Sequence, residues 1–165
     1  MSEQVPMTWE PPSAKQRQAM LDAATSIAIV GASSNPARSS NFVATYLLSS
    51  SAHYDIYMVN PRETEILGEP VYSSLADLPV MPDIVDVFRR PEDLPGVAAE
   101  AIDIGAKVFW AQLGLHNDDA VAMAHEAGLG AVTNRCLKIE HARFHGGLHL
   151  AGFDTGVISS RRLAH

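Results

Sequence analysis

The sequence predicts an α/β fold: a Rossmann-like, doubly wound parallel sheet of about five core strands with helices on both faces. The first observation is a series of short runs that are almost continuously apolar, as is typical of parallel strands buried on both faces. These runs cover residues 27–30, 55–59, 84–88, 107–110 and 130–133. The second is that helical patterns alternate with them, which indicates right-handed βαβ units. We predict the order 3-2-1-4-5 for the five strands, numbered along the chain.

Helices are expected over residues 14–23, 39–50, 94–104 and 118–127. Ser13 is positioned to cap the first, with Gln16 three residues later as in a capping box. The last has the clearest boundaries, because Asn117 is a good N-cap and Gly128 follows its end. These punctuation residues support the alternation on which the fold class depends.

Three segments depart from this regular pattern. Residues 63–82 lack a full crossover helix and are expected to hold a small extra strand at 70–72 and a short turn at 74–77. Residues 1–12 carry three prolines and read as an extended arm that Trp9 packs onto the domain. Gly146 and Gly147 break any helix over 139–144, and the tail 146–165 is irregular. We expect a single domain over residues 1–165.

Composition narrows the classes of function. With 165 residues, 47% of them hydrophobic, the chain is long enough for one compact core, and no apolar run is long enough to cross a bilayer. The single cysteine excludes an internal disulfide framework and fits the reducing cytoplasm. The formal net charge of −7 disfavours nucleic acid and anionic membranes as partners. We expect a cytoplasmic protein with a small-molecule ligand; its oligomeric state stays open, a homo-oligomer included.

The loop after the first strand has the composition of a phosphate site. Gly31 ends the strand, and Ser33, Arg38, Ser39 and Ser40 come before or at the start of the next helix. The first N–H groups of a helix lack internal partners and lie at the positive end of its dipole, so this loop suits an anion. Pro36 stands where a dinucleotide fingerprint has its third glycine, so the alternative is an ordinary polar connection.

The ends of the next two strands add positive charge. Asn60-Pro61-Arg62 follows the second strand, where a protein that holds the ribose of NAD usually has an acidic residue. Arg62 suits an additional phosphate instead, which points to NADP or to a 3′-phosphorylated adenosine. Arg89 and Arg90 end the third strand, and side-chain alternation turns one of them toward the crevice. The alternative for Arg62 is a surface arginine after a turn-forming Asn-Pro, and the alternative for Arg89 and Arg90 is a simple charged strand end.

Other reactive side chains carry weaker signals. Cys136 with His141 as base is a possible nucleophile, but a lone cysteine is more often a small buried hydrophobe. Histidines recur at 141, 145 and 149, yet the two glycines interrupt the helix that a metal-binding face would need. Trp110 is expected to be a core or rim aromatic rather than a stacking platform for a ligand. We therefore expect no catalytic residue and no metal site.

The ordered motifs together resemble the small bacterial CoA-binding proteins, stand-alone relatives of the CoA-binding domain in the α subunit of succinyl-CoA synthetase. The resemblance covers about residues 14–145. The motifs are Gly31 to Ser40, Val59-Asn60-Pro61, Ile66-Leu67-Gly68 with Val71-Tyr72 and Leu75, Asp86 to Pro91, Trp110 to Gly114, and Asn134-Arg135-Cys136 through Ile139-Glu140-His141.

The resemblance implies that the domain holds coenzyme A across the carboxyl edge of its sheet. It places Gly31, Ala32, Ser33, Arg38, Ser39 and Ser40 at the pyrophosphate and Asn60, Pro61 and Arg62 near the adenosine and its 3′-phosphate. It also places Phe88, Arg89 and Pro91 in the nucleotide pocket, with Gln112 and Gly114 toward the pantetheine arm. Synthetase activity is not expected, because the larger enzymes use a phosphorylated histidine on a second domain.

These observations favour a protein that binds CoA or an acyl-CoA as a carrier or sensor without catalysis of its own. One alternative is an NADP-dependent oxidoreductase with an atypical phosphate loop. A second is acyl transfer by Cys136, which requires a reactive thiolate. A third is a scaffold whose pocket is vestigial.

Overall fold

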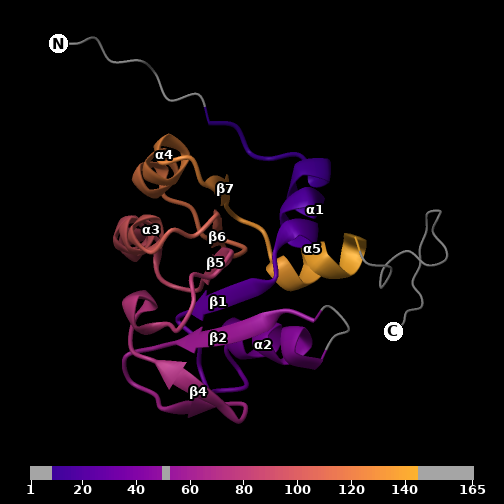
Figure 1. Cartoon of the computed structure of the whole chain (residues 1–165). Coiled ribbons are helices and arrows are strands. Elements are labelled where there is room, and N and C mark those ends of the chain that lie inside the picture. Colours follow the sequence, from indigo (N-terminus) through magenta and orange to yellow (C-terminus); the bar gives the residue numbers. More distant parts are fainter. Residues whose placement is uncertain (1–8, 50–52, 145–165) are drawn as a thin grey trace.

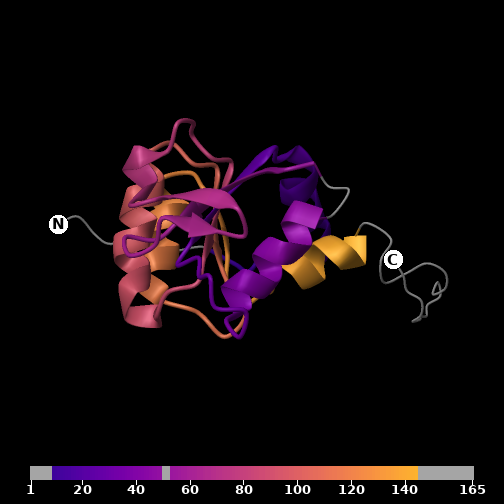
Figure 2. The same cartoon turned by 90° about the horizontal axis from the view of Figure 1, so that it is seen from below.

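The computed structural model of the chain describes residues 9–49 and 53–144 and shows one mostly parallel sheet between two layers of helices (Figures 1 and 2). Its described strands are β1 (Ser26–Val30), β2 (Asp55–Val59), β3 (Glu65–Ile66), β4 (Glu69–Tyr72), β5 (Ile84–Val87), β6 (Val108–Ala111) and β7 (Gly130–Val132). They lie in the order β3-β4-β2-β1-β5-β6-β7, and only the β3–β4 pair is antiparallel. The predicted Rossmann-like α/β class is confirmed.

The predicted strand order 3-2-1-4-5 is wrong for one strand. The third predicted strand, now β5, pairs with β1, with Val87 beside Val30, rather than lying outside β2. The place beside β2 is taken by β4, whose Val71 pairs with Met58. The small strand expected at 70–72 therefore does belong to the sheet, and it occupies the position that we had given to the later, more apolar run.

The helices divide between the two faces of the sheet (Figure 2). One face is covered by α1 (Ala14–Ala23), α2 (Ser39–Ser49) and α5 (Leu137–Phe144), which bury Leu21, Leu47 and Leu137 in the same apolar cluster. The other is covered by α3 (Leu94–Asp103) and α4 (Asp118–Glu126). Short 3₁₀ helices span Leu75–Asp77 and Pro91–Asp93. Among the described residues, no helix is sufficiently long and apolar to span a membrane.

Several local predictions are confirmed at their named residues. Ser13 and Gln16 form the capping box of α1, and the Asn117 side chain caps α4. The indole Nε1 of Trp9 donates to the carbonyl oxygen of Ala131 at 3.0 Å, so Trp9 itself packs onto the domain. Helix α5 begins at Leu137, two residues earlier than expected. Gly146, Gly147 and the tail lie outside the described residues.

Asp86 is an unusual core residue. It lies on β5 between Ile29 of β1 and Trp110 of β6, and its side chain is fully buried. Neither carboxyl oxygen has a hydrogen-bond partner in the part of the chain that the structure describes. Burial raises the pKa of this carboxyl group well above its ordinary value, because a charge without a partner is poorly solvated there. The native state therefore favours the protonated acid.

The variant Asp86→Asn should change how stability depends on pH. The unfolded chain releases the Asp86 proton near its ordinary pKa of 3.8, whereas the native state keeps it to higher pH. Between the two pKa values, the free energy of unfolding of the parent should fall by about 1.4 kcal/mol per pH unit relative to the variant. Urea denaturation of both proteins from pH 4 to pH 8 measures this difference. Parallel stability curves would contradict the assignment.

Candidate functional site

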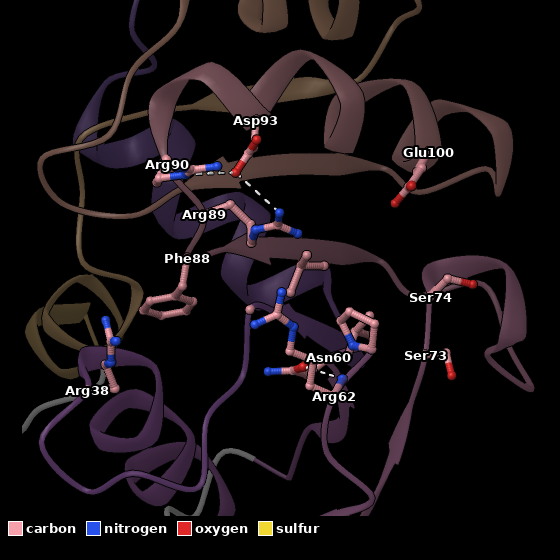
Figure 3. A pocket seen from close by; sticks show the side chains of 14 residues that line it. Arg38, Asn60, Arg62, Ser73, Ser74, Phe88, Arg89, Arg90, Asp93 and Glu100 are labelled. Carbon is pink, nitrogen blue, oxygen red and sulfur yellow. Dashed lines mark hydrogen bonds and ion pairs between the residues drawn. The ribbon is translucent and has the colours of Figure 1, made fainter.

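The carboxyl ends of β1, β2 and β5 surround a cavity of about 610 Å³ (Figure 3). It lies where the strand order reverses on either side of β1, which is the usual place for a ligand in an open α/β sheet. A neighbouring hollow of about 280 Å³ extends toward the start of α2. The two share the lining residues Gly31, Arg38, Asn60, Phe88 and Arg89. They therefore form one continuous candidate site.

Gly31 lets the loop after β1 pass close to the end of β5. Its φ is +87°, a conformation that side chains disfavour. A Cβ atom at this position would lie 2.5 Å from the carbonyl oxygen of Phe88, well inside van der Waals contact. Its N–H donates to Val59 at 3.0 Å, so the loop is held against both neighbouring strands. Only glycine fits this crossing without displacing the backbone.

Some amides of this loop are used within the loop itself. The N–H of Ser34 donates to the Glu63 carboxylate at 3.1 Å, that of Asn35 to the Ser33 hydroxyl at 3.0 Å, and that of Ala37 to the Asn35 side chain at 2.9 Å. These bonds fold the loop into one defined shape. They also determine which N–H groups of the loop stay without a hydrogen-bond partner.

Three other amides of the loop and the start of α2 belong to residues that line the smaller hollow. Within residues 9–49 and 53–144, no hydrogen bond is formed by the N–H groups of Ser33, Ser39 or Ser40, and all three serines line that hollow. Ser39 and Ser40 begin α2, where the helix dipole is positive. Unpaired amides of this kind at a helix start are a physical binding site for an anion.

Asn60 fastens the loop rather than facing a ligand freely. Its side-chain nitrogen donates to the carbonyl oxygen of Ala32 at 2.7 Å, and its side-chain oxygen accepts from the N–H of Arg62 at 2.7 Å. The Asn41 side chain likewise donates to the carbonyl oxygen of Ser33 at 3.0 Å. The side chains of Asn60, directly after β2, and of Asn41 in α2 thus hold the loop in place before any ligand is present.

Arginines supply the positive charge of the site. Figure 3 shows Arg38 at one end of the cavity, with Arg62 and Arg89 turned toward its middle. Arg89 is paired with Asp93 at 3.2 Å, and its side chain is 42% exposed, whereas that of Arg90 is 74% exposed. Both adjacent arginines line the cavity, and Arg89, the less exposed of the two, also lines the smaller hollow.

The structure brings most of the predicted site residues together and leaves others apart. Lining the cavity or the hollow are Gly31, Ser33, Arg38, Ser39, Ser40, Asn60, Pro61, Arg62, Phe88 and Arg89. Ala32, Pro91, Gln112 and Gly114 do not line either one. Gln112 is buried and accepts from the N–H of Leu137 at 3.2 Å, and the N–H of Gly114 donates to Asn134 at 2.7 Å.

Four polar lining residues were missed by the sequence analysis: Ser73, Ser74, Asp93 and Glu100. The ends of β1 and β2 also add Val30 and Val59 to the lining. The serines follow β4, whose position in the sheet was not predicted. Asp93 and Glu100 belong to a 3₁₀ turn and to α3, and nothing in their spacing marks them as ligand-facing. Only the correct strand order would have directed attention to these segments.

The reactive side chains considered in the sequence lie elsewhere. Cys136 is partly buried against the apolar cluster under α1, α2 and α5, and Trp110 is fully buried. His141 is buried, and its Nδ1 shares a hydrogen bond of 2.8 Å with the Tyr46 hydroxyl. The histidines at 145 and 149 lie outside the described residues. Among those described, no three potential metal ligands are gathered together.

The fold and this arrangement define a Rossmann-like protein with a polar cavity at its topological switch point. The chain belongs to the CoA binding domain family, whose sequence pattern matches residues 25–142. It is 42% identical over 131 residues to the uncharacterized protein YneT of Bacillus subtilis (strain 168), a match that spans 79% of this chain and 96% of YneT. The resemblance inferred from the motifs is confirmed.

Solved structures agree with this family and fold. Prb, a PH1109 protein redesigned for binding, superposes with a TM-score of 0.80 and 38% identity, over 87% of this chain and 99% of its own. A hypothetical protein from Pyrococcus horikoshii OT3 superposes with a TM-score of 0.77 and 39% identity over the same shares. Both likenesses extend over nearly the whole of the related chain.

Replacing Gly31 by alanine should destabilise the fold more than the same change at Gly114. Both glycines have φ near +87°, with values of +87° and +86°, but a Cβ at Gly114 meets no atom within 4 Å. The common backbone cost is about 1–2 kcal/mol, and the clash with Phe88 should add about 1–3 kcal/mol at Gly31. Chemical denaturation measures both variants. Equal losses of unfolding free energy would show that the close approach does not constrain the loop.

Proposed function

We propose that this protein binds coenzyme A or an acyl-CoA in the cavity at the ends of β1, β2 and β5, as a carrier or sensor without catalysis of its own. The observation that carries the proposal is the set of unpaired amides at Ser33, Ser39 and Ser40, close to the Arg38 side chain. Membership of the CoA binding domain family supports the choice of ligand.

The diphosphate of the ligand is assigned to these amides. Backbone N–H groups at the start of α2 donate to phosphate oxygens, and Arg38 adds a charge-assisted hydrogen bond. The whole chain is acidic, with a formal net charge of −7, so attraction of an anion depends on this local arrangement. Arg62 is assigned to the 3′-phosphate of the adenosine.

The composition of the lining supports binding rather than reaction. No cysteine, histidine or lysine is among the residues that line the cavity or the hollow. The ionisable groups there are arginines with Asp93 and Glu100, and Asp93 is paired with Arg89 and Arg90. Such a set neutralises phosphate charge, and among the described residues no serine hydroxyl of the lining is hydrogen-bonded to Asp93 or Glu100, as an activated nucleophile would be.

The oxidoreductase alternative makes use of the same Arg62. A guanidinium at the end of β2 suits the 2′-phosphate of NADP as well as the 3′-phosphate of CoA. The two proposals differ in which nucleotide stabilises the native state, because a ligand that binds only the folded protein raises its apparent stability.

Thermal unfolding with added nucleotides separates these two functions. CoA and acetyl-CoA are expected to raise Tm more than NADP, NADPH and NAD do at the same concentration. ATP is a control for adenine and phosphate without the pantetheine arm. A shift with NADPH and none with CoA would support the oxidoreductase and contradict our proposal.

The variant Arg38→Ala should weaken CoA binding about tenfold, the contribution of a charge-assisted hydrogen bond at an exposed position. The side chain is exposed and pairs with no acid among the described residues, so the fold should be retained. Isothermal titration calorimetry measures the affinity, and circular dichroism monitors the fold. Lys15→Ala, on the far helix α1, removes the same charge outside the site and should have no effect. Unchanged affinity in Arg38→Ala would count against the assignment.

A further inference from the structure

The two ends of the cavity differ in the hydrogen bonds that they offer. Figure 3 shows Arg38, Arg62 and Arg89 at one end and in the middle, and Ser73, Ser74 and Glu100 at the other end. The first group offers only donors, since a guanidinium has no acceptor. The second group brings a carboxylate and two hydroxyls, whose oxygens accept hydrogen bonds.

The acceptors at the second end are uncommitted. The structure gives the Glu100 carboxylate and the Ser73 hydroxyl no hydrogen bond or ion pair with any described residue, although both line the cavity. The Ser74 hydroxyl donates to Asp77 at 3.1 Å, which leaves the lone pairs of its oxygen available. This differs from the other acid of the cavity, Asp93, which is already paired with two arginines.

Between the two ends, the cavity has apolar walls. Val30 and Val59 line it from the ends of β1 and β2, and Pro61 follows directly after β2. A flat ring can pack against such surfaces, while its polar edge reaches one end and a phosphate reaches the other. The cavity is therefore suited to a molecule that is anionic at one end and donates hydrogen bonds from a ring at the other.

We infer that Glu100 and Ser73 select a base with an exocyclic amino group at the position that faces them, as adenine has at the purine 6-position. The amino group donates to the carboxylate and the hydroxyl. A base with a carbonyl at that position, such as hypoxanthine, brings an acceptor against the Glu100 carboxylate and loses the bond to it, although the Ser73 hydroxyl can still donate. The inference rests on the proposed binding of CoA, and it extends that proposal to the group that distinguishes one nucleotide base from another.

The Glu100 charge also fixes the direction of binding. A phosphate placed beside Glu100 would be repelled, and an amino group placed among the arginines would meet only donors. Both mismatches disfavour the reversed orientation. Glu100 thus sets the orientation of the whole ligand as well as the choice of base, although it lies on the exposed side of α3.

Competition against CoA tests this assignment with ADP and IDP, two nucleotides that differ at the purine 6-position. For the parent protein, ADP should displace CoA at a concentration about tenfold lower than IDP, the effect of one hydrogen bond to a partly exposed charged group. Inhibition constants are calculated from the CoA affinity of each protein, measured by calorimetry.

Two variants then locate the selectivity. In Glu100→Gln the side-chain amide can donate to the carbonyl of hypoxanthine, so the preference for ADP should fall toward one. Asp103→Asn removes a negative charge from the same helix, one turn further on and outside the cavity lining, and it should keep the full preference. A preference that persists in Glu100→Gln would overturn the assignment to Glu100.

The same titrations separate the two levels of the proposal. If CoA binds to the parent protein and ADP and IDP displace it equally well, base selection by Glu100 is overturned and CoA binding stands. If CoA does not bind at all, the proposed function and the inference that rests on it both fail.

Discussion

The close crossing of two strand ends at Gly31 is the constraint on which the site depends. The backbone of Gly31 lies so near the Phe88 carbonyl that a side chain has no space, and its N–H is bonded to Val59. The ends of β1, β2 and β5 are thereby brought to one point. The loop that continues from Gly31 can then turn back toward α2 and present its unpaired amides to the cavity. The arginines that follow β2 and β5 reach the same point for this reason.

Preorganisation of this loop explains how an acidic chain can offer an anion site. Asn60, Asn41 and Glu63 bind the loop from three different segments before a ligand arrives. Little conformational entropy is left to be lost on binding, which favours affinity without a large surplus of positive charge. Asp93 has a complementary role, since its bonds to Arg89 and Arg90 hold two flexible side chains near the cavity.

Sequence reasoning was most accurate where the signal is local. Apolar runs marked β1 and β2, and Ser13 and Asn117 marked helix starts, because strand burial and capping are determined within a few residues. The order of the strands was less accessible, since whether β4 or β5 pairs with β2 depends on tertiary packing. The missed Ser73 and Glu100 followed from that error. The isolation of Asp86 in the core likewise depends on neighbours that are distant in sequence.

The β3–β4 hairpin leads into one side of the cavity, at Ser73 and Ser74, and this side is structurally separate from the rest of the lining. The segment replaces a crossover helix by two short strands, which are joined through Leu67 and Gly68 and lie at the margin of the sheet. Most of its residues are not part of the deep core, so substitutions there cost little folding free energy. Evolution can therefore vary the surroundings of Ser73 and Ser74 almost independently of the loop that begins at Gly31. Related chains are expected to diversify at this margin while the crossing at Gly31 stays fixed.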